Sequence, residues 1–356
     1  MNKIKLHKAL KRVTNLPRGK YLFLYLFNKS KHFYYRLIKS TKVAYPSTIM
    51  LELNNHCNLH CTTCPREYAY GKQMDKGYIT LEQAQKVVDE LWPYLDSIGL
   101  TGMGETFLFR EMEQIVDYIR AKNKGIIITL STNAMLPGFI TLAKKVVGKV
   151  DIIHVSIDGL GETYEKIRIG ANFEQFDRNV AELARLCRGT ETTVFLDMVV
   201  TKENYHQLPA MIPYCREKGV RGFYHTTFNL SSVTDTDAEY YQFYHSPEFL
   251  EVLKKLKEAG KKYPEVEVTS WDYKGKNGFQ KCFFPWDYFY ICWDGYVTPC
   301  CAKPFPKELN FGNVFENGAM AVLNGKTFRK FRIMWQKNQT PDFCRKCHFI
   351  ELRPIE

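Results

Sequence analysis

The stretch Cys57-Asn-Leu-His-Cys61-Thr-Thr-Cys64 places three thiols within eight residues, shortly after the apolar run at 49–53, which predicts a β-strand. Three thiolates at this spacing reach around one corner of an iron–sulfur cube, and three ligands leave one iron of a [4Fe–4S] cluster open. A zinc knuckle is the alternative, because Cys-x-x-Cys pairs bind zinc and His56 or His60 is available as a fourth ligand. The motif alone leaves both metals open.

Short apolar runs alternate with amphipathic segments from residue 46 onward, which is typical of βα units and a parallel sheet. Thr80 is suited to cap the first of these helices. Six units are fewer than the eight of a complete barrel, so we predict an α/β fold with a partial (βα)6 TIM-like barrel. The predicted strands lie at 48–53, 97–101, 126–131, 151–157, 193–200 and 220–226, and the helices at 80–95, 109–123, 137–147, 173–187 and 204–218.

This combination resembles the radical S-adenosylmethionine (SAM) superfamily, which has a six-stranded (βα)6 core. The resemblance implies that Cys57, Cys61 and Cys64 hold a [4Fe–4S] cluster, and that the amino and carboxylate groups of SAM chelate its open iron. It also implies that reduction of this cluster splits SAM into methionine and a 5′-deoxyadenosyl radical. An electron donor such as a flavodoxin or ferredoxin is an implied partner.

Residues just after each predicted strand are candidates for the SAM pocket, because sites in α/β barrels lie at the carboxyl ends of the strands. Thr101-Gly-Met-Gly-Glu105 resembles the family's GGE segment, which receives the SAM amino group, although Met103 replaces the first glycine of the triplet. Short polar side chains that can hydrogen-bond the ribose and methionine moieties follow the next two strands. By resemblance, the SAM pocket contains Gly102, Gly104, Glu105, Ser131, Asn133, Ser156 and Asp158.

Arg168 resembles an arginine that pairs with the SAM carboxylate in relatives, because a planar guanidinium can hold a carboxylate bidentately. A surface salt bridge is the alternative for this side chain. The chain departs from the family at the residue before Cys64, where Thr63 replaces an aromatic side chain that lies beside adenine in many members.

A second group of cysteines follows residue 281, with Asp294-Gly295 predicting a two-residue hairpin turn between two short strands. Cys301 is an alternative to Cys300 as a ligand, because neighbouring strand residues face opposite ways. Four thiolates can close a second [4Fe–4S] cluster, and a zinc ribbon would use the same donors. The predicted ligands are Cys282, Cys300, Cys344 and Cys347.

This second group resembles the SPASM/twitch domain in its short form with a single auxiliary cluster. We therefore expect the barrel to be followed by a small domain with a β-hairpin and a helix. The expected domains are a basic, aromatic-rich arm at 1–45, a radical SAM core at 46–230, a helical connection at 231–264 and the SPASM/twitch domain at 265–356. Cys187, Cys215 and Cys292 are expected to be buried apolar residues.

The N-terminal arm carries the whole formal net charge of +12, because residues 1–51 contain twelve Lys or Arg and no Asp or Glu. Its aromatic residues are interleaved with these charges. Three interpretations remain open: an extension that packs its aromatic face on the barrel, peripheral contact with an anionic membrane, and, least favoured, nucleic-acid binding. The longest apolar run, at 21–27, is too short to span a bilayer, and we expect a cytoplasmic protein, with peripheral attachment at the inner membrane surface as the alternative.

The resemblance implies an enzyme whose deoxyadenosyl radical abstracts hydrogen from its substrate. Our main hypothesis is a small polar substrate, a sugar or glycan precursor that is oxidised or epimerised. The alternative is maturation of a peptide or protein. A non-enzymatic zinc or nucleic-acid binding protein would not explain the polar residues after successive strands. The sequence identifies no catalytic residue beyond the cofactor ligands.

Overall fold

The computed structural model describes residues 3–233, 236–271, 273 and 282–351. Contacts group the chain into two compact units. Unit 1 comprises Met1–His56, Met74–Thr129 and Cys282–Phe343, and unit 2 comprises Cys57–Gln73, Leu130–Lys281 and Cys344–Glu356. Each unit therefore combines segments that are far apart in the sequence. The consecutive domains expected from the sequence, with boundaries at 45, 230 and 264, stay a prediction.

The sheet of unit 1 is built around β1 (Thr48–Leu51), which pairs in parallel with β3 (Ser97–Leu100) on one side and with β10 (Phe289–Ile291) on the other. The strand order is β11-β10-β1-β3-β4, and β4 (Ile127–Thr132) is the strand in which the two units divide. Ile49 and Leu51 are buried, because alternate residues of a strand point to the same face, which here is the covered one. Hence β10, from the C-terminal cysteine region, extends the sheet begun by the first predicted strand.

The predicted hairpin is present, with a different turn. β10 pairs antiparallel with β11 (Val297–Thr298), and the Cys292 amide donates to the Tyr296 carbonyl at 2.9 Å. Three residues, 293–295, therefore form the loop where two were predicted. Gly295 has φ +88°, which fits a type I turn closed by a left-handed glycine.

Two helices of unit 1 form its basic arm, and the other helices follow later in the chain. α4 begins after a capping box. The Thr80 side chain accepts from the Gln83 backbone amide, and the Gln83 side chain accepts from the Thr80 backbone amide. α4 ends at Leu91, earlier than the predicted residue 95, because Pro93 has no amide N–H with which to continue the helical hydrogen bonds. The helices are α1 (Lys3–Thr14), α2 (Lys20–Leu37), α4 (Leu81–Leu91), α5 (Met112–Lys122), α11 (Phe284–Asp287), α12 (Val314–Asn317), α13 (Ala319–Leu323) and α14 (Lys326–Gln336), with the short η2 (Thr106–Leu108).

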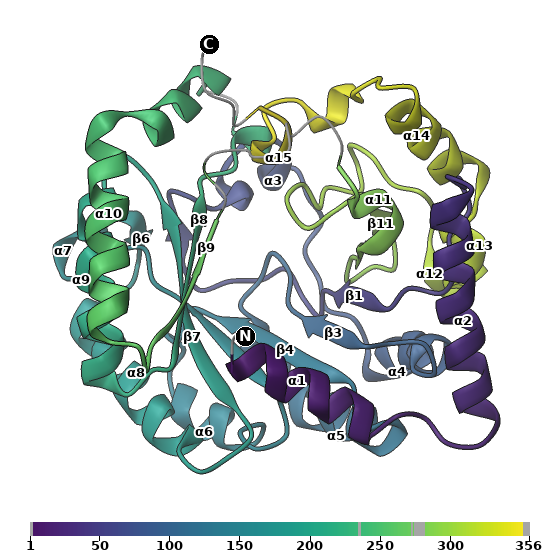
Figure 1. Cartoon of the computed structure of the whole chain (residues 1–356), viewed down its shortest axis with the longest axis horizontal. Coiled ribbons are helices and arrows are strands. Elements are labelled where there is room, and N and C mark those ends of the chain that lie inside the picture. Colours follow the sequence, from purple (N-terminus) through teal and green to yellow (C-terminus); the bar gives the residue numbers. More distant parts are fainter. Residues whose placement is uncertain (1–2, 234–235, 272, 274–281, 352–356) are drawn as a thin grey trace. The chain divides into compact units, whose positions relative to one another are not determined.

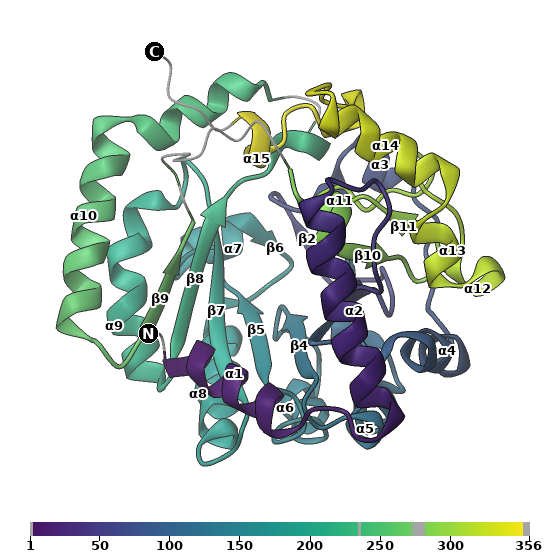
Figure 2. The same ribbon diagram turned by 45° about the vertical axis from the view of Figure 1, so that its right-hand side comes forward.

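The arm is joined to the C-terminal part of unit 1. The C-terminal end of α2 lies close to α14 in Figures 1 and 2. Just after α2, the Thr41 carbonyl accepts from Arg332, and the Val43 amide donates to Asn324 at 2.8 Å. The expectation that the arm packs its aromatic face inward is wrong for the phenylalanines of α2, because Phe23, Phe27 and Phe33 are exposed.

Unit 2 contains a parallel sheet of order β4-β5-β7-β8-β9 and a separate two-stranded ribbon. The sheet strands pair in register, with Ser156 opposite Asp197 and Val200 opposite Thr227. The ribbon joins β2 to β6 antiparallel. The strands are β2 (His60–Cys61), β5 (Ile152–Ser156), β6 (Arg168–Ile169), β7 (Thr193–Val200), β8 (Gly222–Thr227) and β9 (Glu267–Ser270).

Helices of unit 2 follow the strands in sequence, and α9 and α10 lie side by side next to β8 and β9 in Figures 1 and 2. Ser246 caps α10 by accepting from the Phe249 amide at 3.2 Å. The helices are α3 (Ala69–Lys72), α6 (Phe139–Lys144), α7 (Glu162–Ile167), α8 (Phe173–Cys187), α9 (Leu208–Lys218), α10 (Pro247–Lys262) and α15 (His348–Glu351). Short 3-10 turns are η1 (Pro65–Glu67), η3 (Tyr205–Gln207), η4 (Leu230–Ser232) and η5 (Ala238–His245), and η6 (Asp342–Cys344) straddles the division between the units.

The six predicted strands are confirmed as β1, β3, β4, β5, β7 and β8, each within two residues of its predicted ends. Two parallel neighbours were not predicted: β10 beside β1 and β9 beside β8. Cys187, Cys215 and Cys292 are buried, as predicted. In the described part of the chain, no helix combines the length and apolarity needed to span a bilayer.

Candidate functional site

The three cysteines of the opening motif lie on a loop of unit 2 that the β2–β6 ribbon holds. Cys61 is the register partner of Arg168, and the Thr62 amide donates to the Ile167 carbonyl at 2.8 Å. The Cys64 amide then donates to the Cys61 carbonyl at 3.0 Å, which closes a turn. The ribbon therefore fixes the backbone between the second and third cysteines.

Of the three thiols in this loop, Cys61 is buried, and Cys57 and Cys64 are partly exposed. Burial raises the pKa of Cys61 to about 12 and that of Cys64 to about 11, and Cys57 raises both pKa values further. The charge state of Cys57 therefore affects the pKa values of both other thiols. Because metal ligation requires thiolates, binding a metal here would release protons.

Asn133, which follows β4, holds the first cysteine. Its amide nitrogen lies 3.6 Å from the Cys57 sulfur and donates to the Asn58 side chain at 2.9 Å, while its side-chain oxygen accepts from the Met135 amide at 2.8 Å. The sequence placed Asn133 in the SAM pocket, and the structure brings it to the cysteine loop. Ser131 and Ser156 lie half-buried on β4 and β5.

Arg168 forms a buried ion pair with Asp158. Their side chains are 9% and 0% exposed, and the guanidinium approaches the carboxylate to 2.9 Å. Asp158 also accepts from the Val199 amide at 2.9 Å. Among its contacts, Arg168 also reaches the Cys61 sulfur at 3.9 Å. Burial opposes the positive charge of Arg168, but Asp158 and Cys61 hold its pKa above the ordinary value. The pair is therefore not a surface salt bridge.

The donor set fits a thiolate-bound iron–sulfur cluster. The buried cation of Arg168 and the Asn133 amide lie beside two of the sulfurs and would offset thiolate charge. The histidines of the zinc alternative have other contacts: His60 pairs with Glu67 at 3.3 Å, and His56 stacks on Tyr78 at 4.7 Å between ring centroids. Within the described residues, no three Cys, His, Asp or Glu side chains already stand in a metal-binding arrangement.

The GGE-like segment lies in unit 1 against the strand end that precedes Cys57. A Cβ on Gly104 would lie 2.5 Å from the His56 carbonyl oxygen, and one on Gly102 would collide with Glu52. The Glu105 amide donates to the His56 carbonyl at 2.7 Å, and the Glu105 carboxylate accepts from the Phe107 amide at 3.2 Å. Gly104 is therefore required by the close approach of the backbone before Cys57, and Gly102 by the close approach of the Glu52 side chain.

Glu52 is a buried carboxylate that sequence reasoning missed. One of its oxygens accepts from the Met103 amide and the Tyr290 hydroxyl, both at 2.7 Å, and the other accepts from the Trp293 amide at 3.3 Å. Burial raises the pKa of Glu52 to about 7, although these three hydrogen bonds lower it. Glu52 thus joins β1, the GGE-like segment and the hairpin within unit 1. A lone Glu in an apolar strand was the available signal.

Three of the C-terminal cysteines cluster in unit 1. Burial raises the pKa of Cys282 to about 12, and Cys300 and Cys301 contribute further. Cys301 contacts the Tyr288 hydroxyl, whereas backbone amides of Ala302 and Lys303 point at the Cys300 sulfur. The other predicted pair lies in unit 2, where the Cys347 amide donates to the Cys344 carbonyl at 3.4 Å.

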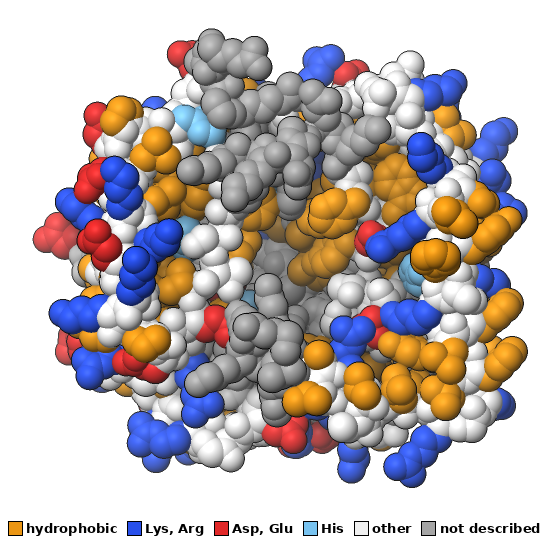
Figure 3. Space-filling model, in the orientation of Figure 1, with side chains coloured by type: hydrophobic (Ala, Val, Ile, Leu, Met, Phe, Trp, Pro, Cys, Tyr) orange, Lys and Arg blue, Asp and Glu red, His pale blue; other side chains and the backbone are white. Residues whose placement is uncertain are grey.

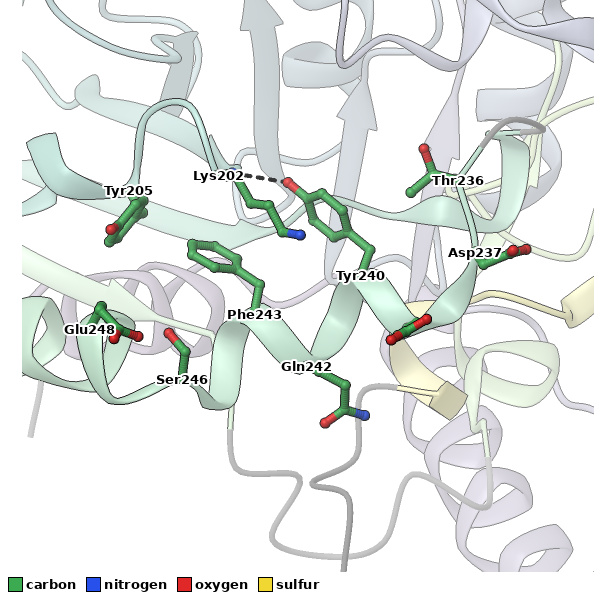
Figure 4. A pocket seen from close by; sticks show the side chains of 10 residues that line it. Lys202, Tyr205, Thr236, Asp237, Tyr240, Gln242, Phe243, Ser246 and Glu248 are labelled. Atoms are coloured by element: carbon green, nitrogen blue, oxygen red, sulfur yellow. Dashed lines mark hydrogen bonds between the residues drawn. The ribbon is translucent and has the colours of Figure 1, made fainter.

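A cavity of about 680 Å³ opens in unit 2 where the chain leaves the carboxyl end of β7. The Lys202 amide donates to the Tyr240 hydroxyl at 2.9 Å, and the Lys202 ammonium lies 4.8 Å from the centre of that ring (Figure 4). Phe243 completes the apolar side, and acidic and neutral polar residues line the rest. The lining residues are Lys202, Tyr205, Thr236, Asp237, Glu239, Tyr240, Gln242, Phe243, Ser246 and Glu248. None of these lining residues was among the site residues predicted from the sequence.

Two family models match the chain. Residues 51–215 match the radical SAM superfamily, and residues 282–348 match SPASM, an iron–sulfur cluster-binding domain. The two matches contain the predicted ligands of the first and second clusters respectively.

Three curated relatives align over most of the chain. The tungsten-containing aldehyde ferredoxin oxidoreductase cofactor-modifying protein of Pyrococcus furiosus is 25% identical over 84% of this chain and 86% of its own length. The subtilosin biosynthesis protein AlbA of Bacillus subtilis is 24% identical over 86% of this chain, which spans 65% of AlbA. The PqqA peptide cyclase of Bradyrhizobium diazoefficiens is 22% identical over 86% of this chain and 80% of its own length.

Solved structures share the fold. SuiB of Streptococcus suis bound to precursor peptide SuiA superposes with a TM-score of 0.66 at 13% identity, over 92% of this chain and 75% of SuiB. The structure of anSMEcpe with bound AdoMet gives a TM-score of 0.61 at 18% identity, over 86% of this chain and 84% of that chain. At these identities the likeness is one of fold, and it confirms the predicted α/β class with a partial barrel and a small domain.

Proposed function

Because the chain belongs to the radical SAM superfamily and carries a C-terminal SPASM domain, we propose that it is a maturase that modifies a peptide or protein. As a radical SAM enzyme, it uses SAM, a SAM-binding [4Fe–4S] cluster and an auxiliary [4Fe–4S] cluster. The observation that carries the peptide substrate is that relatives with peptide substrates, AlbA and the PqqA cyclase, align over 86% of the chain. No relative reported above supports the sugar hypothesis.

We assign Cys57, Cys61 and Cys64 to the SAM-binding cluster, which supplies a 5′-deoxyadenosyl radical from SAM when both are bound and an electron arrives from a donor such as a flavodoxin or ferredoxin. Arg168 holds a positive charge 3.9 Å from the Cys61 sulfur and would stabilise its thiolate. Asn133 orients Cys57 through its amide nitrogen. These two residues are positioning residues, because they act through the cysteines.

The remaining SAM-pocket residues divide into two groups. Gly102 and Gly104 allow the GGE-like segment to lie against the chain before Cys57, and we propose that this segment receives the SAM amino group. Ser131 and Ser156 keep their proposed role as hydrogen-bonding groups for SAM. Asp158 is wholly buried against Arg168, so we propose that it acts on the site through that arginine.

For the auxiliary cluster we propose Cys282, Cys300, Cys344 and Cys347 as ligands. Cys300 is preferred over Cys301 because two backbone amides point at its sulfur, as is favourable around a cluster thiolate. Cys301 contacts Tyr288 instead.

We propose the cavity of Figure 4 as a binding site for part of the peptide substrate. It lies beyond the carboxyl end of β7, the end at which α/β barrels place their sites. Its volume falls within the range of ligand pockets, about 300–1,000 Å³. The aromatic rings of Tyr205, Tyr240 and Phe243 and the carboxylates of Asp237 and Glu248 suit a segment with apolar and basic side chains.

Deuterium transfer into 5′-deoxyadenosine tests the substrate class. Reconstituted, reduced enzyme would be incubated with SAM and uniformly deuterated peptides, and in parallel with deuterated sugars and sugar nucleotides. The proposal expects label from peptides and loss of all SAM cleavage in Cys57→Ala. Label from the sugars with none from peptides would restore the carbohydrate hypothesis and refute the maturase.

A further inference from the structure

Helix α2 exposes an apolar stripe to solvent. The stripe consists of residues spaced at helical intervals of three, four and seven, which places them on one face. Their exposed fractions range from 49% to 72%. Of the fourteen large apolar side chains exposed in the described residues, nine lie between Leu10 and Ile38. The stripe comprises Phe23, Leu26, Phe27, Phe33, Tyr34 and Leu37.

The opposite face of α2 is polar and fixed to unit 1. Asn28 is 2% exposed, donates to the Tyr45 carbonyl at 2.8 Å and accepts from the Tyr45 amide at 3.0 Å. Tyr25 and Lys29 reach Asp96 at 2.8 and 2.6 Å. The helix therefore buries its polar side through specific hydrogen bonds, so its orientation with the apolar side outward is a built feature.

Positive charge surrounds the stripe. Lys20, Lys31, Lys39 and Lys42 are exposed, and residues 1–51 contain no Asp or Glu. The Lys31 ammonium lies 4.7 Å from the centre of the Phe27 ring. Figure 3 shows orange apolar and blue basic side chains interleaved where α2 lies in Figure 1. Soluble monomers rarely expose a contiguous apolar patch of this kind unless a partner covers it.

We propose that α2 docks the protein on an anionic phospholipid bilayer, with the stripe inserted among the headgroups and the lysines on lipid phosphates. Charge complementarity selects this occupant, because an acid-free basic segment matches an anionic surface. The stripe runs for about 21 Å along the helix, at 1.5 Å per residue, and so lies in the plane of the membrane. Peripheral attachment of this kind needs no spanning helix.

Flotation with vesicles tests the proposal on the full-length protein. Vesicles of phosphatidylcholine with about 30% anionic phosphatidylglycerol would be compared with vesicles of pure phosphatidylcholine at low and high salt. The wild type is expected to float with the anionic vesicles only, and less at high salt. The variant Phe23→Ser/Phe27→Ser/Phe33→Ser should bind at least about tenfold more weakly, because burial of its aromatic rings is lost.

Matched variants separate the membrane from other causes. Ile333→Ser changes an exposed apolar residue of α14, and Lys261→Gln/Lys262→Gln removes basic residues from α10, so both should float like the wild type. The variant Lys20→Gln/Lys31→Gln/Lys39→Gln should bind anionic vesicles more weakly than the wild type does. Equal flotation of the wild type and the triple Phe variant would overturn the proposal. A lipid-free dimer that the Phe variant abolishes, or RNA binding without vesicle binding, would also overturn it by assigning the stripe to another occupant.

Discussion

At the scale of single residues, Glu52 holds the GGE-like segment and the β10–β11 hairpin together within unit 1. Its carboxylate accepts from a loop amide, a tyrosine hydroxyl and a hairpin amide, although it is 1% exposed. Burial favours the protonated form, which the raised pKa of about 7 expresses. The group therefore sits near its titration point at neutral pH.

Glu52 is expected to make stability depend on pH. Its pKa is higher in the folded than in the unfolded chain, so its contribution is fully present below about pH 4.5 and is lost as pH rises through about 7. The loss is at most about 3 kcal/mol. Urea denaturation of wild type and Glu52→Gln between pH 5 and 8 measures it. The variant should show a flatter profile, whereas Glu258→Gln on exposed α10 should follow the wild type. Parallel profiles for wild type and Glu52→Gln would contradict the assignment.

The Arg168–Asp158 pair gives a second prediction at this scale. Asp158→Asn removes the partner of a buried guanidinium, and breaking a buried pair in this way costs about 3–5 kcal/mol. Glu174→Gln breaks an exposed pair with Arg178 and should change stability little. Denaturant midpoints of both variants provide the measurement. If Asp158→Asn were as mild as the exposed control, Arg168 would not depend on Asp158.

Site residues that belong to short local motifs, such as Cys57, Gly102 and Gly104, could be predicted from the sequence. The sequence did not predict that Asn133 contacts the Cys57 sulfur, because the two residues lie 76 positions apart. It did not predict that Asp158 pairs with Arg168, because that contact depends on the direction of the two side chains. Tertiary packing determines hydrogen bonds of this kind, and the spacing of residues along the sequence does not predict it.

At the scale of elements, the β10–β11 hairpin depends on its left-handed glycine. Gly295 has φ +88°, and a Cβ there would meet the Asn313 side-chain oxygen at 2.5 Å and the Phe315 ring. Gly219, which ends α9 with φ +72°, has no atom within 4 Å of such a Cβ. The two positions share the backbone conformation and differ in the surrounding space.

We therefore expect Gly219→Ala to cost about 1 kcal/mol from backbone strain alone and Gly295→Ala to cost clearly more. Thermal unfolding of both variants gives the comparison. Gly295→Ala should also lower the iron bound in the C-terminal region, because the hairpin leads directly to Cys300. Similar losses of stability in the two variants would mean that the hairpin turn yields without strain.

At the scale of the whole molecule, the order of strands along the chain was predictable and their neighbours at the sheet edges were not. β1, β3, β4, β5, β7 and β8 follow from alternating apolar runs. β9 pairs with β8 from about 45 residues away, and β10 pairs with β1 from about 240 residues away. Such pairing depends on the strand edges that the folded units leave exposed. The pairing of β10 with β1 brings a C-terminal segment into unit 1, and unit 2 contains the segment Cys344–Glu356.

The metal content of the whole chain tests both clusters at once. Two [4Fe–4S] clusters require about eight irons per chain after anaerobic reconstitution. Cys57→Ala and Cys347→Ala should each lower this to about four, and Cys187→Ala, which removes a buried cysteine outside both groups, should leave it unchanged. Cys300→Ala and Cys301→Ala then distinguish the two candidate ligands, since only the true ligand should reduce the iron content. Iron and sulfide analysis with electron paramagnetic resonance of each variant gives the count, and a protein that binds zinc without iron would refute both assignments.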